Sequence, residues 1–134
     1  LIPYIGQQAE LATHSGWPMI QALLLRHPHD RQVWHIDDEY YFGQSFLVAP
    51  VMSDDNKRDI YLPEGKWVNF FTGERLDGGR WIYGYECPLE LMPVFVRPGT
   101  KIPVYPDDVD CTDDMDLSKA VTITIDDNFT SYKI

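Results

Sequence analysis

Cysteine, basic side chains and long apolar runs are all scarce in this sequence of 134 residues. The two cysteines, Cys87 and Cys111, are too few for a disulfide framework. One bridge between them is possible, but we expect two free thiols. No apolar run approaches the roughly 20 residues that a membrane-spanning helix needs. The excess of acids gives a net charge of −10, which repels nucleic acid and anionic lipid, so we expect neither nucleic acid nor membrane as a partner.

The short motifs that mark common cofactor and catalytic sites are also absent. The chain has no phosphate-binding glycine motif, no Cys-x-x-Cys, no His-Glu-x-x-His and no Gly-x-Ser-x-Gly. We therefore predict no cofactor and no metal centre. The first residues lack an initiator Met and the basic region of a signal peptide. This favours a cytoplasmic over a secreted protein and indicates a missing upstream part.

What the sequence does contain favours a mainly β fold. Hydrophobic residues make up 44% of the chain, enough for a core, and ten prolines with nine glycines suggest short elements with tight connections. Turn-forming residues recur after short apolar runs, as in an antiparallel β-sandwich. Strands are predicted at residues 46–51, 59–62, 66–71, 80–86, 94–96, 101–104, 120–125 and 129–134.

The first 45 residues have a different pattern. Residues 1–14 carry apolar side chains at helical spacing, and Gly16 can end that helix. Residues 19–25 are apolar on both faces, which is typical of a strand in a covered parallel sheet. Residues 37–43 read as a short helix with Asp37 or Asp38 as its N-cap. Such a helix–strand–helix unit needs parallel neighbours, and the sequence contains none.

The stretch MPVFVRPGTKIPV, residues 92–104, predicts a sharp corner between two short strands. Its prolines are too dense for a helix. Pro98 and Gly99 form a turn signal between the extended pieces 94–96 and 101–104.

Four blocks of the sequence together resemble a known family. Residues 1–22 resemble the pattern LxPYIY…A…HxxGxPMMRAL, and DEYYFGQSFLVAPV at 38–51 resembles DxQYMxGxxLLVAPV. YLPEGKWVNFFTGE at 61–74 resembles YLPxGxWxDFWTGE, and PLELMPVFVRPGTKIP at 88–103 resembles PLxxIPLFVRxGSIIP. These blocks, in this order, resemble the C-terminal portion of the retaining α-glycosidases of glycoside hydrolase family 31. Gln21 departs from the family pattern, which often has Arg there.

The resemblance implies an architecture. Residues 1–44 would be the C-terminal end of a (β/α)₈ catalytic barrel, with its seventh helix, eighth strand and a closing helical segment. Residues 45–105 would be the proximal C-terminal β-sandwich. Residues 106–134 would be an acidic loop and final strands that continue the sandwich or start a further β domain. The 92–104 corner would then be structural, with its core formed by Val94, Phe95, Val96 and Ile102.

The resemblance also implies a mechanism whose catalytic groups lie outside this chain. A retaining glycosidase uses two carboxylates roughly 5 Å apart, and in this family both are aspartates that would lie upstream. We expect a segment of an exo-α-glycosidase for terminal α-linked glucose or xylose, itself inactive and structural. Its partners would be the rest of the barrel and, through the parent enzyme, an oligosaccharide or α-glycoside. If the chain is studied alone, apolar faces at 1–12 and 19–25 should remain exposed.

An alternative is a stand-alone carbohydrate-binding β-sandwich without catalysis. Its motivation is a group of aromatic residues that could stack on sugar rings. Alternating aromatics in strands are more often core, and that interpretation is favoured. The aromatic residues are Trp67, Phe70, Phe71, Trp81, Tyr83 and Tyr85.

Two acidic groups could carry chemistry, each with a simpler structural explanation. Asp37, Asp38 and Glu39 could include an acid/base residue, but a helix N-cap explains them. The aspartates within 107–116 could bind Ca²⁺, yet the EF-hand spacing is missing and a solvated loop suffices. We predict no catalytic residue in this chain.

The segment RHPHD offers the remaining candidates. His27, His29 and Asp30 could be metal ligands or sugar contacts. In a barrel, the loop after a strand lies at the active-site face, so Arg26 and His27 are the residues we expect next to substrate. A polar surface loop is the favoured alternative.

Overall fold

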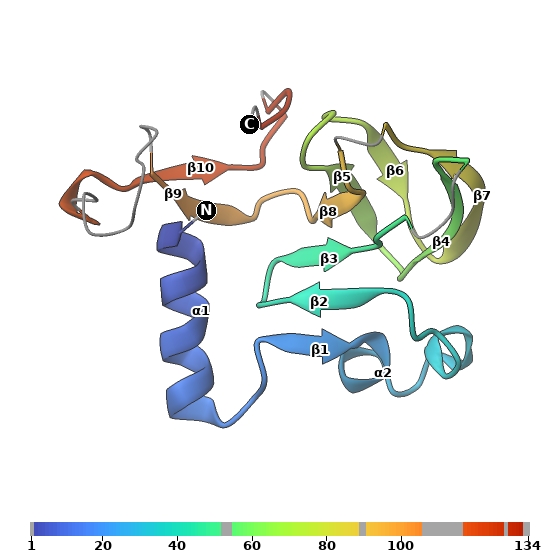
Figure 1. The fold of residues 1–134 in the computed structure, drawn as a ribbon, viewed down its shortest axis with the longest axis horizontal. Helices are drawn as coiled ribbons and strands as arrows, with labels where there is room; N and C mark the ends of the chain where they lie inside the picture. Colours follow the sequence, from blue (N-terminus) through green and yellow to red (C-terminus); the bar gives the residue numbers. More distant parts are fainter. Residues whose placement is uncertain (1, 52–54, 89–90, 106–116, 128, 133–134) are drawn as a thin grey trace.

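The computed structural model describes residues 2–51, 55–88, 91–105, 117–127 and 129–132 (Figure 1). A long helix precedes a set of strands that pair in antiparallel fashion throughout the described residues. No helix in this part of the chain has the length and apolar character needed to cross a membrane. The elements are α1 (Ile2–Ser15), β1 (Ile20–Ala22), α2 (Leu23–Arg26), η1 (Arg31–Val33), β2 (Tyr40–Phe42), β3 (Phe46–Val48), β4 (Lys57–Leu62), β5 (Lys66–Asn69), β6 (Arg75–Asp77), β7 (Arg80–Glu86), β8 (Val94–Val96), β9 (Lys101–Val104), η3 (Leu117–Lys119) and β10 (Val121–Thr124).

The described strands form one central sheet and two smaller ones. The central sheet has the order β1-β2-β3-β8-β5-β6, while β4 pairs with β7 and β9 pairs with β10. Successive residues of its inner strands point to opposite faces. Phe46 and Val48 therefore pack in one cluster with α1 and β9, and Leu47 packs in the other with β4. The central sheet is covered on both faces at β3 and β8, and these two strands are apolar and buried throughout.

The two core clusters lie on opposite faces of the central sheet. The first contains Tyr4, Phe46, Val48, Val68, Phe70, Val94, Val96, Ile102, Val104 and Ile125. The second contains Leu23, Val33, Tyr41, Leu47, Ala49, Ile60, Tyr61, Leu62, Trp67 and Phe95.

Helix α1 is fastened to the turn between β2 and β3. The Tyr4 hydroxyl donates to the Phe42 carbonyl at 2.8 Å and accepts from the Ser45 amide at 3.1 Å. The buried Gln8 side chain accepts from the Gln44 amide at 3.0 Å. These bonds satisfy backbone groups of the turn and fix the helix against the sheet.

The predicted corner at 92–104 is confirmed. Strand β8 belongs to the central sheet, whereas β9 pairs with β10, so the chain changes sheets between them. Gly99 has φ +85° at this turn, a conformation that glycine adopts without strain. The four residues predicted as its core, Val94, Phe95, Val96 and Ile102, are all buried.

Most other predicted elements are also confirmed, with shifted ends. The predicted helix 1–14 is α1, and Gly16 with φ +78° follows its last residue. The strands predicted near β3, β4, β5, β7, β9 and β10 are present. Strand β6 was not predicted, because its sequence, RLD, has little β propensity. The described residues 129–132 contain no strand, contrary to the prediction for 129–134.

The prediction of a helix at 37–43 is wrong. Tyr40–Phe42 is strand β2, which pairs with β1 and β3. Its aromatic residues favour strand, and Gly43, with φ +68°, forms the turn to β3. Hydrogen bonding to β1 on one side and β3 on the other makes this segment a strand, although its local sequence pattern resembles a short helix.

The prediction of a parallel strand at 19–25, covered on both faces, is also wrong. β1 is short, pairs antiparallel with β2 alone among the described strands, and lies at the edge of the central sheet. Ile20 is 59% exposed. Helix α2 follows directly, and only its Leu23 enters the core. The predicted boundary between residues 44 and 45 stays a prediction, although β2 and β3 pair across it.

Exposed apolar side chains gather in the N-terminal quarter of the chain. Among the described residues, ten large hydrophobic side chains are exposed, and seven of them lie between positions 2 and 34. The expectation of an exposed apolar face is confirmed within 19–25 at Ile20, Leu24 and Leu25, although Leu23 is buried. Within 1–12, Ile2 and Leu11 are exposed, whereas the predicted face with Ile5, Ala9 and Ala12 is half-buried.

Candidate functional site

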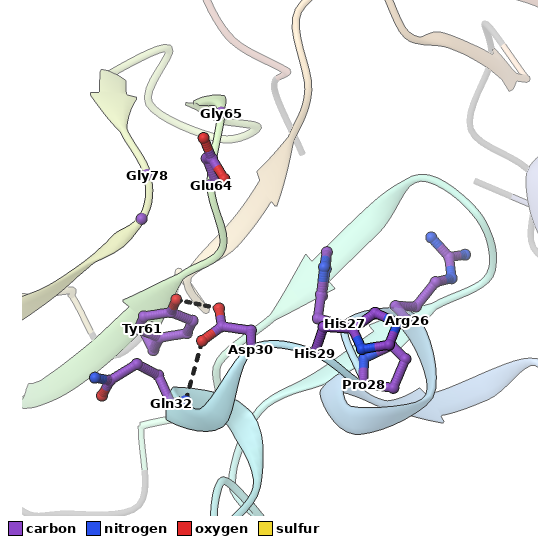
Figure 2. Close-up of a pocket in the computed structure, with 11 residues that line it drawn as sticks. Arg26, His27, Pro28, His29, Asp30, Gln32, Tyr61, Glu64, Gly65 and Gly78 are labelled. Atoms are coloured by element: carbon purple, nitrogen blue, oxygen red, sulfur yellow. Dashed lines mark hydrogen bonds between the residues drawn. The ribbon is translucent and has the colours of Figure 1, made fainter.

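A cavity of about 1010 Å³ lies between the loop after α2 and the two adjacent turns β4–β5 and β6–β7. Figure 2 shows Tyr61 and Asp30 facing one another, with Glu64 above Tyr61 and Arg26 at the opposite end. The lining residues are Arg26, His27, Pro28, His29, Asp30, Gln32, Tyr61, Glu64, Gly65, Gly78 and Gly79.

The wall formed by the loop after α2 is fastened to the β4–β7 layer. The Asp30 carboxylate accepts a short hydrogen bond from the Tyr61 hydroxyl and another, at 3.0 Å, from the Gln32 amide (Figure 2). The latter caps η1. Burial and the neighbouring Asp30 raise the pKa of Tyr61, so its hydroxyl remains a donor. The Trp81 indole donates to the Gln32 side-chain oxygen at 3.1 Å.

Arg26, predicted to be next to substrate, lines the cavity but uses its guanidinium within the protein. Its Nε donates to Gln21 Oε1 at 2.9 Å, and Nη2 donates to the Gly43 carbonyl at 3.0 Å. The guanidinium also lies 4.5 Å from the centre of the Tyr41 ring, within cation–π range. Arg26 therefore joins α2 to the β2–β3 turn. Gln21, the departure from the family pattern, is its partner.

His27, the second predicted residue, is similarly engaged. Its Nε2 lies 2.7 Å from the Tyr41 hydroxyl. Burial first, and then the charge of Arg97, lower the pKa of His27, so the imidazole is neutral at pH 7. Arg97 itself lies 4.1 Å from the centre of the Trp67 ring. The interior side of the cavity is thus a packed cluster of rings and guanidinium groups.

Three other lining side chains keep polar atoms uncommitted. His29 and Glu64 are exposed and make no hydrogen bond or ion pair with any described residue. Gln32 uses its oxygen for Trp81, while its amide nitrogen has no partner in the described part of the chain. Sequence analysis named His29 but missed Gln32, Tyr61 and Glu64. No local signal indicates that residues about 30 positions apart meet, and only the packing of the β4–β7 layer against the central sheet and the loop after α2 brings them together.

The acids at 37–39 lie outside this cavity, and the N-cap interpretation is wrong because no helix follows. Asp38 forms an ion pair with Arg58 at 3.1 Å. The Glu39 side chain is fully buried, and its Oε1 accepts from the Tyr61 amide at 2.7 Å and contacts Arg58 at 3.4 Å. Burial raises the pKa of Glu39 to about 7. Asp38 and Glu39 therefore fasten β4 to the start of β2.

The described residues contain no group of three or more His, Cys, Asp or Glu side chains that could hold a metal ion. The acidic run at 107–116 lies outside the described residues, so its calcium interpretation stays a prediction. Cys87 is a buried free thiol, and Cys111 also lies outside the described part.

The aromatic group is mostly core, as favoured. Trp67 and Phe70 are almost completely buried. Phe71, Trp81 and Tyr85 are partly buried and pack against the two core clusters. Tyr83 alone among the six is largely exposed, at 75%. A single exposed ring offers no extended platform for sugar stacking.

Comparisons with known proteins connect this fold to carbohydrate-active enzymes. Residues 16–102 match the model of the glycosyl hydrolase family 31 C-terminal domain. An isomaltosyltransferase of Sporosarcina globispora is 35% identical over 98% of this chain, which spans 11% of that protein. An α-xylosidase of Emericella nidulans is 33% identical over 78% of this chain, which spans 14% of that protein.

The structural comparison agrees. A family 31 dextranase of Flavobacterium johnsoniae, solved with isomaltotriose, superposes with a TM-score of 0.82 at 32% identity. The match covers 96% of this chain and 16% of the dextranase chain. The chain thus spans less than a fifth of each of these three relatives.

Proposed function

Because this chain belongs to glycosyl hydrolase family 31, we propose that it is the C-terminal segment of a retaining exo-α-glycosidase acting on terminal α-linked glucose or xylose. The observation that carries the proposal is the family match over residues 16–102. Relatives include an α-xylosidase and an α-glucosidase. Since relatives also include transferases, hydrolysis rather than glycosyl transfer is part of the proposal.

The segment's own contribution is structural in this proposal. Retaining hydrolysis needs two carboxylates roughly 5 Å apart, one of them free to attack the sugar. Glu39 is buried against Arg58 and Tyr61, and Asp30 accepts hydrogen bonds from Tyr61 and Gln32. Glu39 and Asp30 both connect the β4–β7 layer to neighbouring elements. This is consistent with the proposal that the catalytic aspartates belong to the upstream part of the parent enzyme.

The exposed apolar side chains near the N-terminus are proposed to pack against the remainder of the catalytic barrel. Trp17, Ile20 and Leu25 are about half exposed, at 55%, 59% and 49%. Patches of this kind mark interaction surfaces. This chain spans less than a fifth of its relatives, and the rest of the parent enzyme would supply the surface that covers these side chains. Arg26 and His27 then lie next to substrate as supports of the cavity wall.

The chain alone is expected to show no turnover of an aryl α-glucoside, while the full-length enzyme hydrolyses it. The reason is that the catalytic carboxylates are supplied upstream. Release of the aryl group, followed by absorbance with both proteins at equal concentration, is the measurement. Turnover by the purified chain, free of host enzyme, would contradict the proposal.

Ile20→Asp in the full-length enzyme is expected to lower the melting temperature by several degrees. It places a charge on an edge strand that the proposal buries against the barrel. The matched control is Tyr83→Asp, at a position that is 75% exposed on β7 and outside the proposed contact. Equal melting temperatures for the two variants would rule out burial of Ile20.

A further inference from the structure

We propose that the cavity binds a neutral sugar unit of an oligosaccharide substrate through His29, Gln32 and Glu64. This rests on the proposed function, and it assigns sugar contact to side chains other than Arg26 and His27, the two residues expected next to substrate from the sequence. Arg26 and His27 form the wall, while these three side chains carry the free polar atoms.

The chemistry of the three groups matches hydroxyl groups. A sugar hydroxyl donates one hydrogen bond and accepts others. Glu64 offers a carboxylate acceptor, Gln32 an amide donor, and His29 a ring nitrogen of either kind. They come from the β4–β5 turn, from η1 and from the loop before it. All three line the same cavity. Its volume of about 1010 Å³ lies at the upper end of common ligand sites.

The cavity is held open by the backbone of its turns. A Cβ at Gly78 would lie 1.9 Å from the Pro63 carbonyl oxygen. That oxygen accepts from the Trp67 indole at 2.8 Å. The β4–β5 and β6–β7 turns are therefore packed tightly against each other. At Gly65, Gly78 and Gly79 these turns present backbone without a side chain to the cavity, which leaves room for a bulky ligand beside Glu64.

The charges of the lining disfavour an anionic ligand and are compatible with a neutral one. The cation Arg26 is committed to Gln21, Gly43 and the Tyr41 ring. Asp30 and Glu64 are the two acids of the lining, and they repel an anionic ligand such as a phosphate. A neutral glycan meets no such repulsion, and the commitments of Asp30 to Tyr61 and Gln32 keep the wall rigid on binding.

The test uses the full-length enzyme with Glu64→Ala and His29→Ala. We expect KM for isomaltotriose to rise about 5- to 20-fold in each variant, the range for loss of one or two sugar hydrogen bonds. Glu86→Ala is the matched control, since Glu86 is an exposed acid on β7 in an ion pair with Lys57. Unchanged KM values for isomaltotriose in both cavity variants would overturn the proposal.

The two proposals fail in different ways. If the full-length protein hydrolyses no α-glycoside, the proposed function fails. The same variants are then compared by calorimetric titration with isomaltotriose. A Kd that is raised 5- to 20-fold in the variants supports the cavity site even then, whereas equal affinities or no binding to the unaltered protein overturn it.

Discussion

Asn69→Ala is expected to destabilise the chain by about 3 kcal/mol, because it removes three hydrogen bonds of one buried side chain at once, each worth about 1 kcal/mol. Asn69 is 2% exposed at the end of β5. Its Oδ1 accepts from the Phe71 amide at 3.0 Å and the Thr72 amide at 3.1 Å. Its Nδ2 donates to the Tyr85 hydroxyl at 2.8 Å. This one side chain therefore closes the turn after β5 and ties it to β7.

Asn69→Asp separates the acceptor role of Asn69 toward the turn amides from its donor role toward the Tyr85 hydroxyl. Aspartate keeps the acceptor for both turn amides, and the family pattern quoted above has Asp here. The Tyr85 hydroxyl, which now donates to Glu74 at 3.0 Å, would have to turn toward the new carboxylate. We expect a loss of about 1 kcal/mol, from the lost Glu74 bond and the added negative charge. Urea unfolding of the three proteins measures the differences, and equal stability of the Ala and Asp variants would refute the turn-closing role.

Sequence reasoning succeeded where one local signal and the packing agree. The 92–104 corner is an example, since its prolines exclude helix, Gly99 allows the turn, and the apolar residues beside it fill the core. It failed where a strand is defined by its neighbours. Tyr40–Phe42 is too short to show a period, and its pairing with β1 and β3 decides its state.

The same reasoning explains the mixed result for the first strand. An apolar run suggests burial on both faces, and the parallel sheet is the usual setting. Here the doubly covered strands are β3 and β8, in an antiparallel sheet between two layers. The run at 19–25 instead exposes Ile20, Leu24 and Leu25. The sequence indicates that these apolar side chains should be buried, but it does not show whether the residues that bury them belong to this chain.

The cavity was beyond sequence reasoning for a different reason. The segment RHPHD is a candidate because of its titratable residues. Two of them, Arg26 and His27, use their polar atoms in hydrogen bonds within the protein. Glu64 lies in a turn that reads as ordinary solvent-exposed chain. Its place opposite Asp30 depends on how the β4–β7 layer packs onto the central sheet.

Glu39 is expected to make the chain less stable as the pH rises through neutrality. The side chain is buried between β2 and β4, and its Oε2 accepts no hydrogen bond from the described residues. Burial, which outweighs the Tyr61 amide and the Arg58 charge, raises the pKa of Glu39 from 4.5 to about 7. A group whose pKa is raised on folding binds its proton more tightly in the native state. Its contribution is therefore complete below about pH 4.5 and lost as the pH rises through 7.

The measurable consequence is a difference between the unaltered chain and Glu39→Gln, which cannot titrate. Between pH 5 and pH 8, we expect the stability of the unaltered chain to fall by about 2 kcal/mol relative to the variant. Comparing the two proteins at each pH cancels the titration of the other acids. Asp38→Asn, which removes the 53% exposed partner of the same arginine, should preserve the fall. Parallel stability curves for the unaltered chain and Glu39→Gln would show that Glu39 remains ionised in the fold, with Arg58 compensating its charge across the whole range.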